Sequence, residues 1–174
     1  ASLGFAGSAG CSQHETNFNE NKPLLVGIEG LCFGINLDVH EIVEKLSKEF
    51  DISTSVSTGD YGRHVEYIKR TVQNKQPVVL LGFSAGCDEV RRAAKECEDY
   101  KVRKIIVLDP TLTGRPHGKF SKNVEEVVCF RNKGDLCNTL RGREVLPEDC
   151  ESSSTKIRNY EIDCPGHLSL PHSP

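Results

Sequence analysis

The chain alternates short apolar runs with amphipathic helical patterns, and this alternation restricts its fold more than any other feature. Apolar runs of strand length stand at residues 23–29, 52–57, 77–83, 103–109, 124–131 and 156–162. Strands that alternate with helices of about ten to fifteen residues favour right-handed βαβ units. The sequence therefore predicts an α/β fold, a three-layer α/β/α sandwich around a mainly parallel sheet of about five or six strands.

Helical periodicity marks three segments between the earlier runs. Apolar side chains recur at a spacing of three or four residues in the segments 39–50, 61–72 and 90–97, which places them on one face of a helix. Asp38 suits the N-cap of the first segment, and Glu41 suits the capping box. We expect these helices to cover the two faces of the sheet.

The overall composition bounds the class of protein. A chain of 174 residues fits one domain, and we expect a flexible tail over residues 1–22 and a single domain over residues 23–174. The formal net charge is −3, the pI is near 6.1, and Lys and Arg are scattered. These features argue against nucleic acid as a partner. No apolar run reaches the length of a transmembrane segment.

The pentapeptide GFSAG, Gly82 to Gly86, stands where an apolar run meets the third helical segment. The nucleophile elbow of serine hydrolases has this form, because a tight strand-to-helix turn needs residues with almost no side chain around the serine. Gly82, Ala85 and Gly86 meet that need. The pattern predicts Ser84 as a catalytic nucleophile, and the alternative is a Gly-rich packing turn.

A serine nucleophile needs an imidazole that takes its proton. The chain has six histidines, and His167 follows the last apolar run in the sequence DCPGH. This position agrees with the order nucleophile, acid, base along the chain of α/β hydrolases. We therefore expect His167 to be the general base, with a surface loop histidine as the alternative.

Two aspartates compete for the third catalytic position, the carboxylate that orients the imidazole. Asp109 ends the run 103–109 within IVLDP, and Asp135 follows the next run within RNKGDLC. Both follow predicted parallel strands, whose carboxyl ends hold the sites of α/β sheets. The residues alone leave both assignments open, and a simple Asp-Pro turn is a further alternative for Asp109.

Backbone N–H groups must stabilise the oxyanion of acyl transfer. Ala85, directly after Ser84, is one expected donor. The loop EGLCFG after the first run supplies the second, with Leu31 as the candidate and Cys32 as the alternate. The glycine spacing of this loop matches neither a dinucleotide fingerprint nor a P-loop, and the cysteine and histidine spacings do not suggest zinc. We expect no cofactor and no metal.

The stretch VVCFRNKGDLC, residues 127–137, resembles the acid loop of the cutinases, which are small serine esterases without a lid. The resemblance implies that Asp135 is the triad acid and that Cys129 and Cys137 form a disulfide. It also implies a minimal α/β-hydrolase core without a large lid. The sequence LDP at 108–110 resembles instead the pancreatic-type lipases, where the acid lies on that earlier strand, and keeps Asp109 as the alternate acid.

Together these features predict a serine hydrolase that cleaves carboxylic esters through an acyl-enzyme on Ser84, with a small-molecule or lipid ester as substrate. Two alternatives stay open. One is a non-catalytic binding protein on the same scaffold, and the other is a thioesterase or acyltransferase with the same triad. The eight cysteines favour a secreted or otherwise extracytoplasmic location with some disulfides. The sequence does not predict the oligomeric state.

Overall fold

The computed structural model of the chain describes residues 23–28, 39–46, 53–56, 65–66, 68–69, 77–110, 118–133 and 144–163. Its elements are β1 (Leu24–Ile28), α1 (Val39–Leu46), β2 (Ser53–Val56), β3 (Val78–Phe83), α3 (Gly86–Glu96), β4 (Val102–Leu108), β5 (Glu126–Asn132), the 3₁₀ turn η3 (Pro147–Asp149) and β6 (Lys156–Ile162). The strands form one six-stranded sheet in the order β2-β1-β3-β4-β5-β6. Every neighbouring pair is parallel. The predicted α/β class with a parallel sheet is confirmed.

The strand bounds follow the predicted runs closely. The run 156–162 coincides with β6, whereas the run predicted from 124 begins too early, because β5 starts at Glu126. Val124 makes only an isolated bridge with Val102. Apolar character therefore extends beyond the regular strand at this point, since Val124 is buried outside it.

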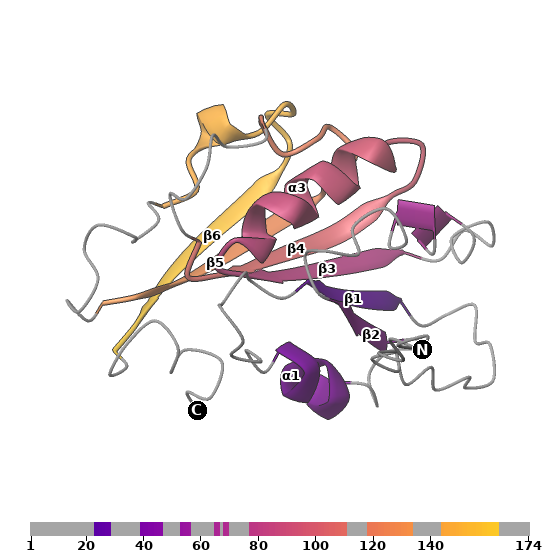
Figure 1. Cartoon of the computed structure of the whole chain (residues 1–174). Coiled ribbons are helices and arrows are strands. Elements are labelled where there is room, and N and C mark those ends of the chain that lie inside the picture. The colour runs from indigo at the N-terminus through magenta and orange to yellow at the C-terminus, as the bar shows by residue number, and fades with distance from the viewer. Residues whose placement is uncertain are drawn as a thin grey trace, which may run out of the picture.

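Helices lie on both faces of the sheet (Figure 1), with α3 over β3 and β4 and α1 on the opposite face. Two separate apolar clusters result. The cluster under α3 includes Val90 and Cys129, and the cluster on the α1 face includes Val43 and Phe83. All residues of β1 and β3 are buried, because covered parallel strands have no solvent face. This explains why both read as continuous apolar runs.

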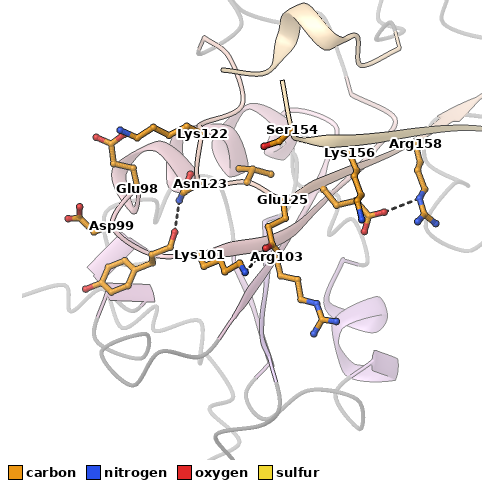
Figure 2. Close-up of a pocket in the computed structure, with 13 residues that line it drawn as sticks. Glu98, Asp99, Lys101, Arg103, Lys122, Asn123, Glu125, Ser154, Lys156 and Arg158 are labelled. Carbon is orange, nitrogen blue, oxygen red and sulfur yellow. Dashed lines mark hydrogen bonds and ion pairs between the residues drawn. The ribbon is translucent and has the colours of Figure 1, made fainter. Parts of the chain in front are cut away.

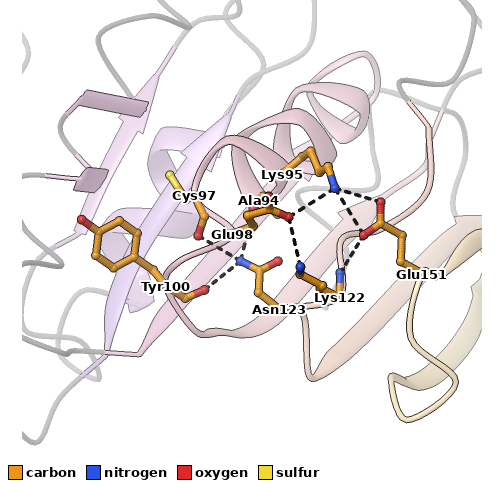
Figure 3. A network of polar contacts seen from close by, with 8 residues as sticks. All are labelled: Ala94, Lys95, Cys97, Glu98, Tyr100, Lys122, Asn123 and Glu151. Atoms are coloured by element: carbon orange, nitrogen blue, oxygen red, sulfur yellow. Dashed lines mark hydrogen bonds and ion pairs between the residues drawn. The ribbon is translucent and has the colours of Figure 1, made fainter.

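The helix α3, which follows the GFSAG turn, is held at its far end by a side chain from the loop before β5. The Asn123 side-chain amide donates hydrogen bonds to the carbonyls of Ala94 at 3.2 Å, Cys97 at 3.1 Å and Tyr100 at 2.7 Å (Figure 3). Carbonyl groups at a helix C-terminus lack partners within the helix. Asn123 therefore caps α3 and fixes it against the sheet.

Candidate active site

Ser84 lies in the tight turn between β3 and α3 and adopts a left-handed backbone conformation. Its φ is 55°, which costs a residue other than glycine about 1–3 kcal/mol and persists only where surrounding contacts impose it. Two such contacts are present. The Ser84 N–H donates to the Leu108 carbonyl at 3.0 Å, and the Ser84 carbonyl accepts from the Cys87 N–H at 3.1 Å. The tight strand-to-helix turn that the motif predicts is thus formed.

Gly82 allows the end of β3 to approach the start of α3. A Cβ at Gly82 would lie 2.6 Å from the Gly86 carbonyl oxygen and 2.9 Å from the Cys87 Cα. Both contacts are with backbone atoms, which cannot rotate away. The Cys87 thiol also links the start of α3 to the end of β3, because it donates a hydrogen bond to the Gly82 carbonyl at 3.2 Å. The glycine at the start of the motif is therefore required by space.

Ala85 follows Ser84 at the N-cap position of α3. The first turn of α3 brings backbone N–H groups and the positive end of the helix dipole beside the serine. Asp88 and Glu89 lie in that turn and Lys95 in the last, which suits the dipole. The backbone N–H groups and the helix dipole suit an anion that develops next to Ser84. The role of Ala85 as an oxyanion donor stays a prediction.

Asp109 lies beside Ser84 at the same edge of the sheet. Phe83 is paired with Leu108, so Ser84 and Asp109 each follow directly at the carboxyl ends of β3 and β4. Asp109 has a φ of 43°, and within the described part of the chain only Ser84 shares a positive φ among residues other than glycine. Asp109 is 5% exposed, and one of its carboxylate oxygens accepts the Asn132 N–H at 3.2 Å. The alternate acid is therefore a buried, conformationally strained carboxylate next to the serine.

The other predicted site residues lie outside the described residues. These are Asp135, His167, Leu31 and Cys32. The strands that precede them are described, and the carboxyl ends of parallel strands lie at one edge of the sheet. β1 ends at Ile28, β5 at Asn132 and β6 at Ile162, all at the edge that carries Ser84. The predicted roles of these four residues remain predictions.

The buried cysteines correct one expectation. Cys87, Cys97, Cys129 and Cys150 all carry free thiols, so the Cys129–Cys137 disulfide that the cutinase resemblance implied is wrong. The side chain of Cys129 is buried in the cluster under α3. Burial raises the pKa of the Cys129 thiol to about 11. Cys137 itself lies outside the described residues.

The sequence does not predict the contacts that two residues make at this edge. The Cys87 thiol bonds the Gly82 carbonyl and also lies 3.5 Å from the Leu108 carbonyl, the group that accepts the Ser84 N–H. Asn132 is 3% exposed and bonds Asp109 through its backbone. The position of Cys87 in the first turn of the helix after Ser84 was a signal that could have indicated its contact. No sequence pattern indicates that the Asn132 backbone N–H bonds Asp109.

A surface hollow of about 720 Å³ lies at the opposite edge, around the amino ends of β4, β5 and β6 (Figure 2). Charged side chains of both signs line it, and several pair with each other. Lys101 pairs with Glu125, and Arg158 pairs with Glu126 at 2.9 Å. Because these charges neutralise one another and Ser84 is at the other edge, we do not place the active site there.

Other site types find no support in the residues that the structure describes. No group of three or more metal-binding side chains occurs among them, and no helix among them is long and apolar enough to cross a membrane. No element of the described ranges forms a large lid.

Comparison with solved structures shows an α/β-hydrolase fold. No protein-family model and no curated protein matches the sequence. Human thioesterase 2 has a TM-score of 0.59 at 10% identity, covering 88% of this chain and 89% of that one. The type II thioesterase BorB of the borrelidin biosynthetic cluster has a TM-score of 0.58 at 14% identity, covering 92% and 89%. XC6422 from Xanthomonas campestris, an α/β serine hydrolase without a lid, has a TM-score of 0.57 at 11% identity, covering 87% and 76%.

Proposed function

We propose that this chain is a serine hydrolase that cleaves carboxylic esters through an acyl-enzyme on Ser84. The observation that carries the proposal is the conformation of Ser84, a residue with φ of 55° held between β3 and the start of α3. Residues held in such strained conformations cluster at active sites. A turn that served packing alone would have glycine at position 84, because glycine adopts a positive φ without strain.

In the proposed mechanism the Ser84 hydroxyl oxygen attacks the carbonyl carbon of the ester while His167 takes the hydroxyl proton. The negative oxygen of the tetrahedral intermediate is stabilised by the backbone N–H groups of Ala85 and Leu31. Collapse of the intermediate breaks the bond to the alcohol, which leaves with the proton from His167. Water then attacks the acyl-enzyme by the same steps and releases the acid. Asp135 orients the imidazole, with Asp109 as the alternate acid.

A thioester substrate is the second candidate. Two of the similar structures are described as thioesterases, human thioesterase 2 and BorB. The proposed triad suits both substrates, since ester and thioester differ in the leaving group and share the acyl carbonyl. In a non-catalytic binding role the strained conformation of Ser84 would serve no chemical step.

Active-site labelling tests the proposal. A fluorophosphonate probe should label the wild-type protein, and Ser84→Ala should abolish labelling. Ser154→Ala is the matched control, because Ser154 is an exposed serine at the opposite edge of the sheet (Figure 2). Labelling that survives in folded Ser84→Ala contradicts the proposal and favours the binding role.

Substrate panels then separate the two candidates. Hydrolysis of nitrophenyl esters and of matched N-acetylcysteamine thioesters should be compared by kcat/KM at each acyl length. We expect faster ester cleavage and a preference for short or medium acyl chains, in line with an open site. A higher kcat/KM for thioesters at every length identifies a thioesterase instead.

A further inference from the structure

A chain of hydrogen bonds links the carboxyl ends of the last four strands of the sheet. From β3 to β6 its members are Ser84 N–H to Leu108 O at 3.0 Å, Asp109 N–H to Phe130 O at 2.7 Å, Asn132 N–H to Asp109 Oδ1 at 3.2 Å and Lys133 N–H to Ile162 O at 2.8 Å. The predicted nucleophile, acid and base each follow, within five residues, a strand that this chain of hydrogen bonds connects. The geometry of these hydrogen bonds therefore affects the relative positions of the strand ends that precede the predicted catalytic residues.

One link in this chain uses a side chain where the others use backbone carbonyls. At the end of β5, the Asn132 N–H is accepted by the carboxylate of Asp109 from the end of β4. Both residues are buried, at 3% and 5% exposure. A buried N–H that loses its partner is costly and tends to move until it finds another. The carboxylate thus holds the last residue of β5 at its buried position.

The segment that leaves β5 at this point carries the predicted triad acid. Asn132 is the last residue of β5, and Asp135 follows three residues later. A displacement of the end of β5 therefore bears on a residue only three positions further along the chain. Catalytic groups must be held within about 0.5 Å of their productive positions.

We propose that Asp109 is a positioning residue, whose carboxylate holds the Asn132 amide and so fixes the end of β5, the strand that precedes the predicted acid Asp135, relative to Ser84. This inference rests on the proposed function. In this role Asp109 serves as a hydrogen-bond acceptor, whereas as the triad acid it would serve as a negative charge beside His167. Its positive φ fits the role, because Asp, Asn and Gly are the residues that adopt this conformation most readily.

Three substitutions at Asp109 separate the two roles. Asp109→Asn keeps an oxygen acceptor and tolerates the positive φ, but removes the charge. Asp109→Gly keeps the backbone conformation and removes the acceptor. Asp109→Ala removes the acceptor and adds strain at φ 43°. Comparing Gly with Ala isolates the backbone effect.

The positioning role predicts that Asp109→Asn keeps more of the wild-type kcat than Asp109→Gly does, because the acceptor remains. Asp109→Gly should lower kcat about 10- to 100-fold with little change in KM, and the pH dependence of kcat/KM should keep its midpoint. Asp135→Asn should lower kcat about 10⁴-fold, as loss of a triad carboxylate does. An inactive Asp109→Asn together with a fully active Asp135→Asn overturns the inference and makes Asp109 the acid.

A second measurement does not depend on catalysis. Hydrogen exchange of the Asn132 amide, followed by NMR, should be slow in wild type and Asp109→Asn and at least tenfold faster in Asp109→Gly. Unchanged protection in folded Asp109→Gly refutes the positioning role. Ester hydrolysis that persists in Ser84→Ala refutes the proposed function instead, so the two failures are distinguishable.

Discussion

Replacing Gly82 by Ala tests whether the site depends on the close approach of β3 and α3. The added Cβ would lie 2.6 Å from the Gly86 carbonyl oxygen, and ordinary contact begins at 3.4 Å. Strand and helix must therefore separate by about 0.8 Å, since neither contacting group is a flexible side chain. Overpacking of this kind costs about 1–3 kcal/mol of unfolding free energy.

The same shift acts on Ser84, which lies between the two displaced elements. A misplacement of about 1 Å reduces catalysis by up to roughly 100-fold, so we expect kcat of Gly82→Ala to fall about 10- to 100-fold. Urea unfolding and ester hydrolysis measure the two effects. Folded Gly82→Ala with wild-type stability and wild-type kcat would refute the argument.

Gly118→Ala is the matched control for this prediction. Gly118 has φ of 77°, and a Cβ there would meet nothing within 4 Å. The substitution should cost about 1 kcal/mol through backbone strain and leave kcat unchanged. A comparable loss of kcat in both variants would mean that destabilisation, and not displacement of Ser84, reduces activity.

Two further predictions concern stability. Asn123→Ala removes hydrogen bonds to the carbonyls of Ala94, Cys97 and Tyr100, at the end of α3 and just after it. It should lower the unfolding free energy by about 1–3 kcal/mol in urea titrations. An effect below about 0.5 kcal/mol would show that water replaces the cap. Burial raises the pKa of the Cys97 and Cys129 thiols to about 11 from the model-compound value of 9.0. The unfolded chain therefore ionises first, so this contribution to stability is full below pH 9 and is lost as the pH rises towards 11. Urea unfolding from pH 8 to 11 should show this fall in the unfolding free energy, and Cys129→Ala should make the fall smaller. If Cys129→Ala leaves the dependence of the unfolding free energy on pH unchanged, the fall does not come from Cys129.

The fold was predictable because its evidence lies in short stretches of sequence. Strands that are covered on both faces must be continuously apolar, and β1 and β3 are. The turn at Ser84 was predictable for a similar reason, since Gly82 and Gly86 stand next to it in the chain. Local patterns report local constraints well.

The contacts of Asp109 and Cys129 show where such prediction ends. Asp109 bonds the backbone of a residue 23 positions away, which depends on how β4 and β5 pair. The disulfide at Cys129 was expected because residues 127–137 resemble a loop of the cutinases. The side chain of Cys129 is buried under α3 instead, because it points to that face of the strand. The predicted roles of Asp135 and His167 depend in the same way on segments that follow the strands.

The all-parallel sheet has a consequence for how the protein folds. Among the described strands no two neighbours can form a hairpin, and even Ile105 of β4 pairs with Val127, 22 residues further along the chain. Folding must therefore close long loops before any strand pair forms, which slows it. The Ser84 N–H finds its acceptor on β4, so a partly folded chain with β3 and α3 but without β4 cannot hold the serine in its strained conformation. We expect Ser84 to adopt its strained conformation only after the strands at the centre of the sheet have paired.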